Sequence, residues 1–231
     1  MSEAVGSNMS TRRRRLGVRL GLVTDVHSHA AELASALALF RQRRVDRVVT
    51  IGDTIDAFAR SEGAPEVTAL LLEADAVGVW GNHDFSLRGE VSETAQRRFP
   101  DAVFAFMART QPRLVLADCH FSHKEASVDP NDVAQLWDVS DRPLDLVARA
   151  SLGFQAVTQQ WQFVGHYHRW WAATPAGQVF WEDGEPLAFK PLERYFVVVG
   201  ATCEGWCAVL DLEKSMLEPL WCGPAEPGSF T

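Results

Sequence analysis

The sequence predicts an α/β protein in which short buried strands alternate with helices. Continuous apolar runs such as residues 18–24 and 46–51 have the composition of strands that are buried on both faces of a sheet. Between these runs, apolar residues recur at helical spacing, and strands alternating with helices are typical of parallel βαβ units. Hydrophobic residues make up 47% of the 231 residues, which is enough for the core of one large domain.

The first half of the chain contains strands and helices of this kind. Leu33, Leu37 and Phe40 lie on one face of the first predicted helix, which ends in arginines that suit the negative end of its dipole. Pro65 fits the first turn of the second helix. The predicted strands are residues 18–24, 46–51 and 76–80, and the predicted helices are residues 30–43 and 66–74.

Beyond residue 84 the pattern changes to a helical stretch followed by short strands. Residues 85–110 have a helical pattern that Pro100 interrupts. Residues 129–160 mix acidic, proline-broken and helical pieces, and Asp183-Gly184 predicts a turn between two of the later strands. The predicted strands are residues 113–117, 162–165, 179–181, 187–189, 195–199, 206–210 and 217–221, and the last five form a β-meander.

We expect a single domain over residues 16–222, because no internal repeat or low-complexity linker divides the chain. Residues 1–15 end in four arginines, and the apolar stretch that follows is short and carries Arg19. A disordered basic arm is therefore a better interpretation of residues 1–15 than a secretory signal. The proline- and glycine-rich residues 223–231 predict a flexible tail.

The composition argues against several classes of function. A formal net charge of -8 is the wrong sign for a dedicated nucleic-acid binder. No apolar run reaches the roughly 20 residues that a membrane span needs. The four cysteines have no CxxC spacing, which favours buried reduced thiols. The sequence therefore predicts a cytoplasmic protein with no membrane partner, and it leaves the oligomeric state open.

Chemically active side chains follow the predicted strands at their carboxyl ends, where ligands bind in open α/β sheets. The chain has seven histidines, and each lies inside or next to one of these strand-end clusters. Imidazoles mixed with carboxylates suit manganese, iron, zinc, cobalt or nickel. The candidate metal ligands are Asp25, His27, Asp53, Asn82, His123, His166 and His168.

Seven ligands are more than one ion needs, but they suit two ions that share a carboxylate. Residues two apart near a strand end point to the same side, so Asp25 and His27 can grip one ion together. Asp53 can place one oxygen on each ion. Two such metals can clamp the attacking and leaving oxygens of an in-line displacement at phosphorus, and a water between them becomes the nucleophile.

His83 and Asp84 have a different predicted role. His83 lies between Asn82 and Asp84, so it is near the ions without having to bind them. A protonated His83 could act as general acid toward the leaving oxygen. Asp84 could accept the other ring N–H of His83 and hold the ring in the useful orientation.

The series Asp25-x-His27, Gly52-Asp53, Gly81-Asn82-His83-Asp84, His123 and Gly165-His166-x-His168 resembles the calcineurin-like metallophosphoesterases. The resemblance covers residues 18–168 and implies a four-layer αββα sandwich of two mixed β-sheets flanked by helices, with the C-terminal meander as the second sheet. It also implies two divalent ions, with manganese expected first and iron, zinc, nickel or cobalt as alternatives. By position, Asp25, His27, Asp53 and His168 would hold one ion, and Asp53, Asn82, His123 and His166 the other.

Two departures from the phosphoprotein phosphatases of this superfamily point to its small bacterial phosphodiesterase-like branch. Ala57 stands where those enzymes usually have a phosphate-gripping arginine, and Asp84 stands where they have glutamate. The expected function is hydrolysis of phosphomonoesters or phosphodiesters. The alternatives are a catalytically silent scaffold or binding protein with this fold, and a protein serine/threonine phosphatase.

Three further residue assignments remain open at this stage. His120 is the alternative to His123 as a ligand, and His29 either lines the substrate side or closes a turn. The substrate is expected to be a small phosphorylated molecule. A nucleotide would fit if clustered tryptophans stack on its base, although packing is the favoured role of such residues at strand positions. These tryptophans are Trp161, Trp170, Trp171 and Trp181.

Overall fold

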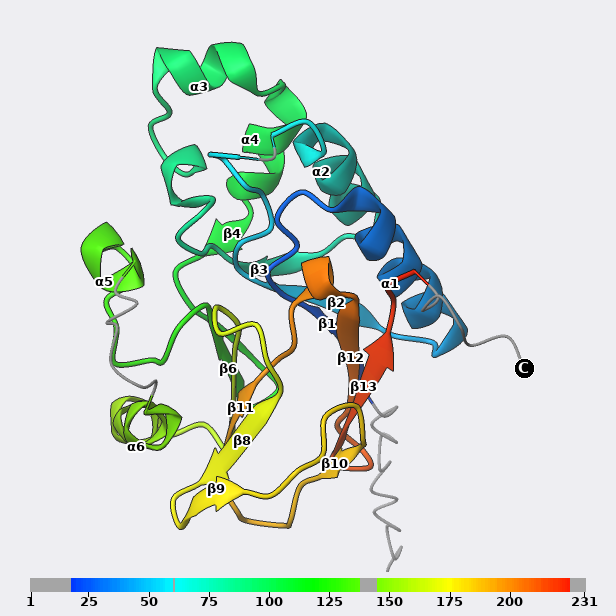
Figure 1. The fold of residues 1–231 in the computed structure, drawn as a ribbon, viewed down its shortest axis with the longest axis vertical. Coiled ribbons are helices and arrows are strands. Elements are labelled where there is room, and N and C mark those ends of the chain that lie inside the picture. Colours follow the sequence, from blue (N-terminus) through cyan, green and yellow to red (C-terminus); the bar gives the residue numbers. More distant parts are fainter. Residues whose placement is uncertain (1–17, 60, 138–144, 225–231) are drawn as a thin grey trace, which may run out of the picture.

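The computed structural model describes residues 18–59, 61–137 and 145–224. The expected basic arm over residues 1–15 lies outside the described residues, and so does the expected tail beyond residue 224. Within the described part of the chain, two β-sheets pack face to face (Figure 1).

The first sheet contains seven strands among the described residues, in the order β10-β13-β12-β1-β2-β3-β4. Its first-half strands run parallel, as the alternation of strands and helices predicts. The later strands extend it in antiparallel pairs from β1 outward. The strands are β1 (Arg19–Val23), β2 (Arg47–Ile51), β3 (Val77–Val79), β4 (Thr110–Gln111), β10 (Leu187–Ala188), β12 (Trp206–Asp211) and β13 (Met216–Trp221).

The second sheet contains six strands over the same residues, in the order β5-β6-β7-β11-β8-β9. Its central strands β6, β7 and β11 are parallel, and the outer strands pair with them antiparallel. The strands are β5 (Leu114–Leu116), β6 (Cys119–Ser122), β7 (Trp161–Val164), β8 (Trp171–Thr174), β9 (Gly177–Val179) and β11 (Tyr195–Val198).

Helices cover the outer faces of both sheets, so the predicted four-layer αββα arrangement is confirmed (Figure 1). α1 (Ala30–Gln42), α2 (Ala64–Glu73) and α4 (Asp101–Met107) pack their apolar faces on the first sheet. α6 (Leu146–Ala156) packs on the second sheet and covers Phe196 and Val198, which are fully buried. The shorter helices are η1 (Phe85–Leu87), α3 (Glu93–Arg98), α5 (Val133–Trp137) and η2 (Thr202–Glu204).

The prediction that the C-terminal strands form the second sheet by themselves was wrong. β12, β13 and β10 join the first sheet through β1, whereas β11, beside β7, and β9, beside β8, belong to the second sheet. The expected turn at Asp183-Gly184 is confirmed, since the N–H of Glu185 donates to the carbonyl of Glu182, but the strands on either side of it pair with others: β9 pairs with β8, and β10 pairs with β13. β11 and β12 are both apolar and buried on nearly every residue, so the sequence pattern does not distinguish one sheet from the other.

The predicted helix over residues 85–110 is shorter and more divided than expected. Pro100 does interrupt it, as the residue that precedes α4. However, residues 88–92 are not helical, and β4 replaces the last part of the pattern. Propensity alone does not capture this, because packing against the sheet decides where such short elements begin.

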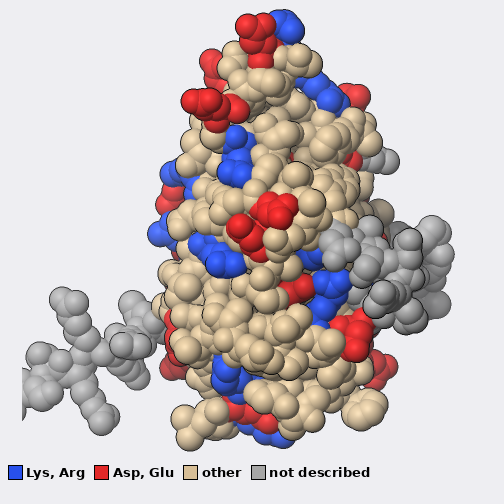
Figure 2. All heavy atoms as spheres, turned by 90° about the vertical axis from the view of Figure 1, so that its left-hand side faces the viewer, with Lys and Arg blue, Asp and Glu red and all other residues tan. Residues whose placement is uncertain are grey.

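The surface agrees with the expectation from net charge. Figure 2 shows lysine and arginine side chains interspersed with aspartate and glutamate over one face, and the described part of this face has no broad basic area. Over the described residues, the structure contains no helix with the length and apolar composition that crossing a membrane requires.

Candidate metal centre

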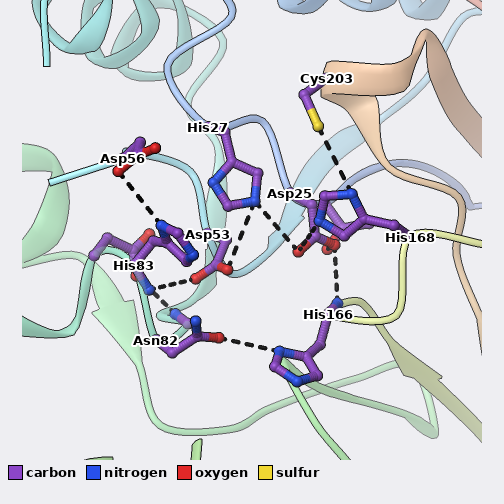
Figure 3. A network of polar contacts seen from close by, with 12 residues as sticks. Asp25, His27, Asp53, Asp56, Asn82, His83, His166, His168 and Cys203 are labelled. Atoms are coloured by element: carbon purple, nitrogen blue, oxygen red, sulfur yellow. Dashed lines mark hydrogen bonds and ion pairs between the residues drawn. The ribbon is translucent and has the colours of Figure 1, made fainter. Parts of the chain in front are cut away.

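The seven predicted metal ligands converge on one region, where strands of both sheets end (Figure 3). Asp25 and His27 follow β1, Asp53 follows β2 and Asn82 follows β3, all in the first sheet. The second sheet contributes the remaining three from the ends of β6 and β7, namely His123, His166 and His168.

One half of the centre is built around the carboxylate of Asp25. The ring nitrogen Nε2 of His27 lies 3.9 Å from Asp25 Oδ1 and 3.8 Å from Asp53 Oδ2. Nε2 of His168 lies 3.5 Å from Asp25 Oδ1. Asp25, His27 and Asp53 each offer a ligand atom within 4.8 Å of the others, which is compatible with one cation held among them.

The other half is built around the amide of Asn82. Its Oδ1 lies 3.0 Å from His123 Nε2 and 3.0 Å from His166 Nδ1. His123 Nε2 is also 3.3 Å from Asp53 Oδ2. Oδ2 of Asp53 therefore faces both His27 and His123, whereas Oδ1 accepts from the backbone N–H of His83 at 2.8 Å. A single oxygen, rather than one oxygen for each ion as expected from sequence, thus lies between the two halves.

The donor set fits divalent transition-metal ions. Asp25 Oδ1 is buried and has no hydrogen-bond partner among the described residues, a costly state for a carboxylate oxygen unless a cation compensates it. His166 Nδ1 and His123 Nε2 lie 3.3 Å apart, and each is 3.0 Å from the same oxygen of Asn82. A divalent transition-metal ion would bind these converging nitrogen and oxygen atoms and compensate the negative charge of the carboxylates.

The backbone at the centre is held in an unusual conformation. Left-handed φ angles are uncommon outside glycine, and they cluster at functional sites where surrounding structure enforces them. Five of the seven predicted ligands have such angles: Asp25 (48°), His27 (44°), Asp53 (48°), His166 (69°) and His168 (50°).

Two glycines allow the strand ends to approach closely. A Cβ at Gly81 would lie 2.1 Å from Asp53 Oδ1, and a Cβ at Gly165 would lie 1.9 Å from Thr24 Oγ1. Both positions therefore require the absence of a side chain. The glycines that precede Asn82 and His166 therefore allow these two ligands to approach Asp53 and Thr24 closely.

The electrostatics of the centre reflect its burial and its crowded charges. Burial would raise the pKa of Asp25, but the His168 ring 3.5 Å from Oδ1 and the charge of His123 hold it below the ordinary value. Burial and the charge of His123 lower the pKa of His166 to about 3. Burial, together with the charge of Asp53, raises the pKa of Asp84 to about 7.

The expectation that Asp84 orients the ring of His83 was wrong. Asp84 is buried, and its two oxygens accept from the backbone N–H groups of Thr54 and Gly81, at 2.8 and 2.7 Å. Asp56 Oδ1 instead lies 3.4 Å from Nδ1 of His83 (Figure 3). Asp84 braces the two strand-end loops, and Asp56 is the carboxylate that faces the histidine.

The structure also brings to the centre residues that the sequence does not single out. Cys203, which the sequence groups with buried thiols, is partly exposed, with its sulfur 4.0 Å from His168 Nδ1. Glu204 Oε1 lies 3.0 Å from the same nitrogen. Both belong to η2, whose backbone N–H groups at Thr202 and Cys203 donate to the carbonyls of Thr24 and Asp25.

The remaining candidates lie where they do not contact the ligands. His120 is buried in β6, and its ring nitrogens have no hydrogen-bond partner among the described residues. His29 is the residue that precedes α1 and makes no side-chain capping bond. The four tryptophans pack into the cores between and outside the sheets, as the favoured interpretation predicts: Trp161, Trp170, Trp171 and Trp181.

Comparisons with known proteins agree with this geometry. The model of the calcineurin-like phosphoesterase superfamily domain matches residues 18–204. Among solved structures, a metallophosphoesterase from Sphaerobacter thermophilus is 21% identical with a TM-score of 0.69, over 89% of this chain and 88% of that chain. The protein TT1561 of Thermus thermophilus is 12% identical with a TM-score of 0.55, over 90% of this chain and 100% of that chain.

A structure described as a novel archaeal phosphodiesterase is 13% identical with a TM-score of 0.52, over 88% of this chain and 99% of that chain. No match was found among curated proteins. At these identities the solved structures establish a common fold, whereas the family match extends over most of the chain and includes every predicted ligand.

Proposed function

The chain belongs to the calcineurin-like phosphoesterase superfamily, and we propose that it is a hydrolase of small phosphomonoesters or phosphodiesters that works with two divalent metal ions. The observation that carries this proposal is the convergence of seven nitrogen and oxygen donors from both sheets around the shared carboxylate of Asp53. Manganese is the ion proposed first.

The donors divide into two sets that share Asp53. When bound, the ions would lower the pKa of a water and neutralise negative charge on the phosphoryl oxygens. In the proposed arrangement Asp25, His27, Asp53 and His168 hold one ion, and Asp53, Asn82, His123 and His166 hold the other.

His83 is the proposed proton donor to the leaving oxygen. Its ring is partly exposed and lies 4.5 Å from the ring of His27, so it is close to the ions without being one of their ligands. Asp56 Oδ1 lies 3.4 Å from its Nδ1, and this arrangement leaves Nε2 available to the substrate.

The site favours small phosphoesters over phosphoproteins. Ala57 is buried and supplies no cation where protein phosphatases usually have arginine. Arg98 approaches this loop, but its guanidinium donates to the carbonyl oxygens of Ala57 and Phe58 and to the Ser61 hydroxyl. These bonds occupy the group that would otherwise be the nearest candidate for phosphate.

The test is an assay of the purified protein with Mn²⁺ on p-nitrophenyl phosphate and bis-(p-nitrophenyl) phosphate. We expect turnover of at least one ester, and a loss of 10²- to 10⁴-fold in His83→Ala, the range that general acid catalysis contributes. Asp53→Asn should lose turnover together with bound metal. Asp132→Asn, at an exposed capping aspartate, is the matched control.

Absence of turnover in the wild-type protein, or activity that both site variants retain, would contradict the proposal. A stable complex isolated from cells with no metal bound would instead favour the catalytically silent scaffold.

A further inference from the structure

Two exposed aromatic rings lie beside His83 and belong to neither core. Phe58 is 57% exposed and Trp137 is 39% exposed. The ring of Trp137 is centred 4.8 Å from the ring of His83, and that of Phe58 is 5.9 Å from it. The two aromatic rings are 5.7 Å from each other. Both rings are therefore close neighbours of the His83 ring.

The loop that carries Phe58 is held firmly although its side chain is open to solvent. Asp56 Oδ1 accepts from the backbone N–H groups of both Phe58 and Ala59 at 2.9 Å. Arg98 donates to the carbonyl oxygens of Ala57 and Phe58 from the other side. The same carboxylate that faces His83 therefore fixes the position of the Phe58 ring relative to it.

Trp137 is anchored from the opposite side of the site, at the end of α5. Its neighbour Leu136 is buried in the core beneath the first sheet's helices. The carbonyl of Gln135 accepts from Nζ of Lys124 at 2.9 Å, and Lys124 directly follows the ligand His123. The position of the indole is thus linked to the second sheet's part of the metal centre.

Single exposed apolar side chains are common on protein surfaces. Adjacent exposed aromatic rings beside a proposed catalytic residue instead indicate a binding surface. Rigid aromatic rings of this kind bind other planar rings by stacking, at little cost in conformational entropy. Because His83 is the proposed donor to the leaving oxygen, a group next to its ring contacts the leaving alcohol rather than the transferred phosphoryl group.

We propose that Phe58 and Trp137 form a binding surface for the leaving group, which makes the preferred substrates phosphoesters of alcohols that carry a planar aromatic ring. This inference rests on the proposed function, because it assumes that His83 protonates the leaving oxygen. The aromatic ring comes either from an aryl group or from a nucleoside, and both sources have the same stacking chemistry. The stacking role that was the less favoured alternative for Trp161, Trp170, Trp171 and Trp181 is assigned here to two other residues.

The test compares leaving groups with and without a planar aromatic ring, matched in bulk in the first pair and differing by the presence of the base in the second. Benzyl phosphate and cyclohexylmethyl phosphate, together with their symmetric diesters, form one pair. Adenosine 5′-monophosphate and ribose 5-phosphate form the other. Phe58→Leu and Trp137→Leu keep apolar surface and remove the ring, whereas Phe180→Leu, at a phenylalanine that is 99% exposed and lies in another part of the chain, is the matched control.

We expect the wild-type protein to prefer the ester with the aromatic ring. Each site variant should lose about tenfold in kcat/KM on the aromatic ester and little on its saturated partner, in keeping with the contribution of one stacked ring. Selective loss in the benzyl pair alone assigns the surface to aryl esters, and selective loss in the adenosine pair alone assigns it to nucleosides. The control should behave as wild type.

Equal losses on both members of a pair would overturn the inference, because they would show that the rings only support His83. Titration with benzylphosphonate and cyclohexylmethylphosphonate, which have no ester bond to cleave, measures the same preference as binding. If no ester is hydrolysed, the proposed function fails, and a ring preference in this titration still tests the aromatic surface by itself.

Discussion

At the scale of single residues, the chemistry of the site depends on which carboxylate faces His83. Asp84 follows His83 directly in the chain, yet its oxygens are used by the backbone N–H groups of Thr54 and Gly81. Asp56 reaches the ring from the neighbouring strand end, 3.4 Å from Nδ1. Proximity in sequence is thus a poor guide to the partner of a histidine, because each turn directs successive side chains differently.

Asp56→Asn is expected to lower kcat by about 10- to 100-fold with little change in KM, because the amide removes the negative charge that faces Nδ1 of His83. An asparagine oxygen can still accept from the N–H groups of Phe58 and Ala59, so the loop should keep its shape. Steady-state measurement of kcat and KM, on an ester that the wild-type protein hydrolyses, tests this prediction.

The matched control for this variant is Asp132→Asn, since Asp132 Oδ1 also accepts from the N–H groups two and three residues later. An Asp56→Asn enzyme with wild-type kcat would rule out the charge of Asp56 as a support for His83.

His120 should make the folded protein sensitive to acid. Burial, with a further contribution from the charge of Arg113, lowers its pKa to about 4, so the fold favours the neutral ring. Above the unfolded pKa of 6.5 the ring is neutral in both states and costs nothing. As the pH falls from 6.5 toward 4, the unfolded chain takes up a proton that the folded chain does not, and stability is lost by up to about 3 kcal/mol.

His120→Gln is therefore expected to flatten the loss of unfolding free energy between pH 7 and pH 5. Urea unfolding at both pH values measures it, and a second comparison between pH 7 and pH 8 should show no difference between variant and wild type. Identical slopes for the two proteins in the acid range would contradict the lowered pKa.

Part of the site could be predicted from sequence because its residues directly follow apolar strands. A carboxylate or imidazole just after a buried strand lies at the sheet edge whatever the rest of the fold does, as with Asp25, Asp53 and His166. Cys203 and Trp137 could not be found in this way. They reach the site through η2 and α5, whose positions depend on packing between elements far apart in sequence.

At the scale of elements, close packing between strand ends shapes the carboxylate of Asp25. Its Oδ2 accepts from Thr24 Oγ1 at 2.7 Å and from the backbone N–H of His166 at 2.9 Å, which leaves Oδ1 for the ions. This requires β1 and β7, which belong to different sheets, to meet closely at Gly165. The glycine is therefore needed for the orientation of a ligand that it does not itself contribute.

Gly165→Ala is expected to lower the content of bound metal and, with it, turnover by at least about tenfold, since the added Cβ would lie 2.7 Å from Asp25 Oδ2. Elemental analysis after Mn²⁺ loading measures the change. Gly89→Ala is the comparison, because Gly89 has a φ of 64° and nothing within 4 Å of an added Cβ. A full complement of metal in Gly165→Ala would contradict this account of the ligand's orientation.

The sheet to which each late strand belongs could not be predicted from sequence. β11 and β12 are both apolar, lie close together in the chain and are buried on nearly every residue. The two strands enter different sheets because η2 lies between them in the chain. Its backbone hydrogen bonds to Thr24 and Asp25 direct the chain from the second sheet to the first. That turn depends on contacts with β1, some 180 residues earlier in the chain, which local patterns do not encode.

At the scale of the whole molecule, the candidate metal centre is also a connection between the two sheets. The first sheet supplies Asp25, His27, Asp53 and Asn82, and the second supplies the three other donors. The apolar layer between the sheets is continuous beneath them and includes fully buried residues such as Leu22, Ile51 and Phe163. Metal ions at this edge would therefore link two layers that the core already holds in register.

Because ions that bind only the folded state stabilise it by mass action, each ion bound from Mn²⁺ at about 100 times its Kd should add about 2.7 kcal/mol to the free energy of unfolding. For a chain of this size, that corresponds to a rise in Tm of roughly 5–10 °C. We expect chelation to reverse the rise, and His27→Ala on the first sheet and His166→Ala on the second each to reduce it, while Asp132→Asn keeps it. Thermal unfolding followed by circular dichroism, with and without Mn²⁺, measures all four proteins. If only first-sheet variants lost the effect, the ions would be held by one layer, and the role of the second sheet in forming the centre would be refuted.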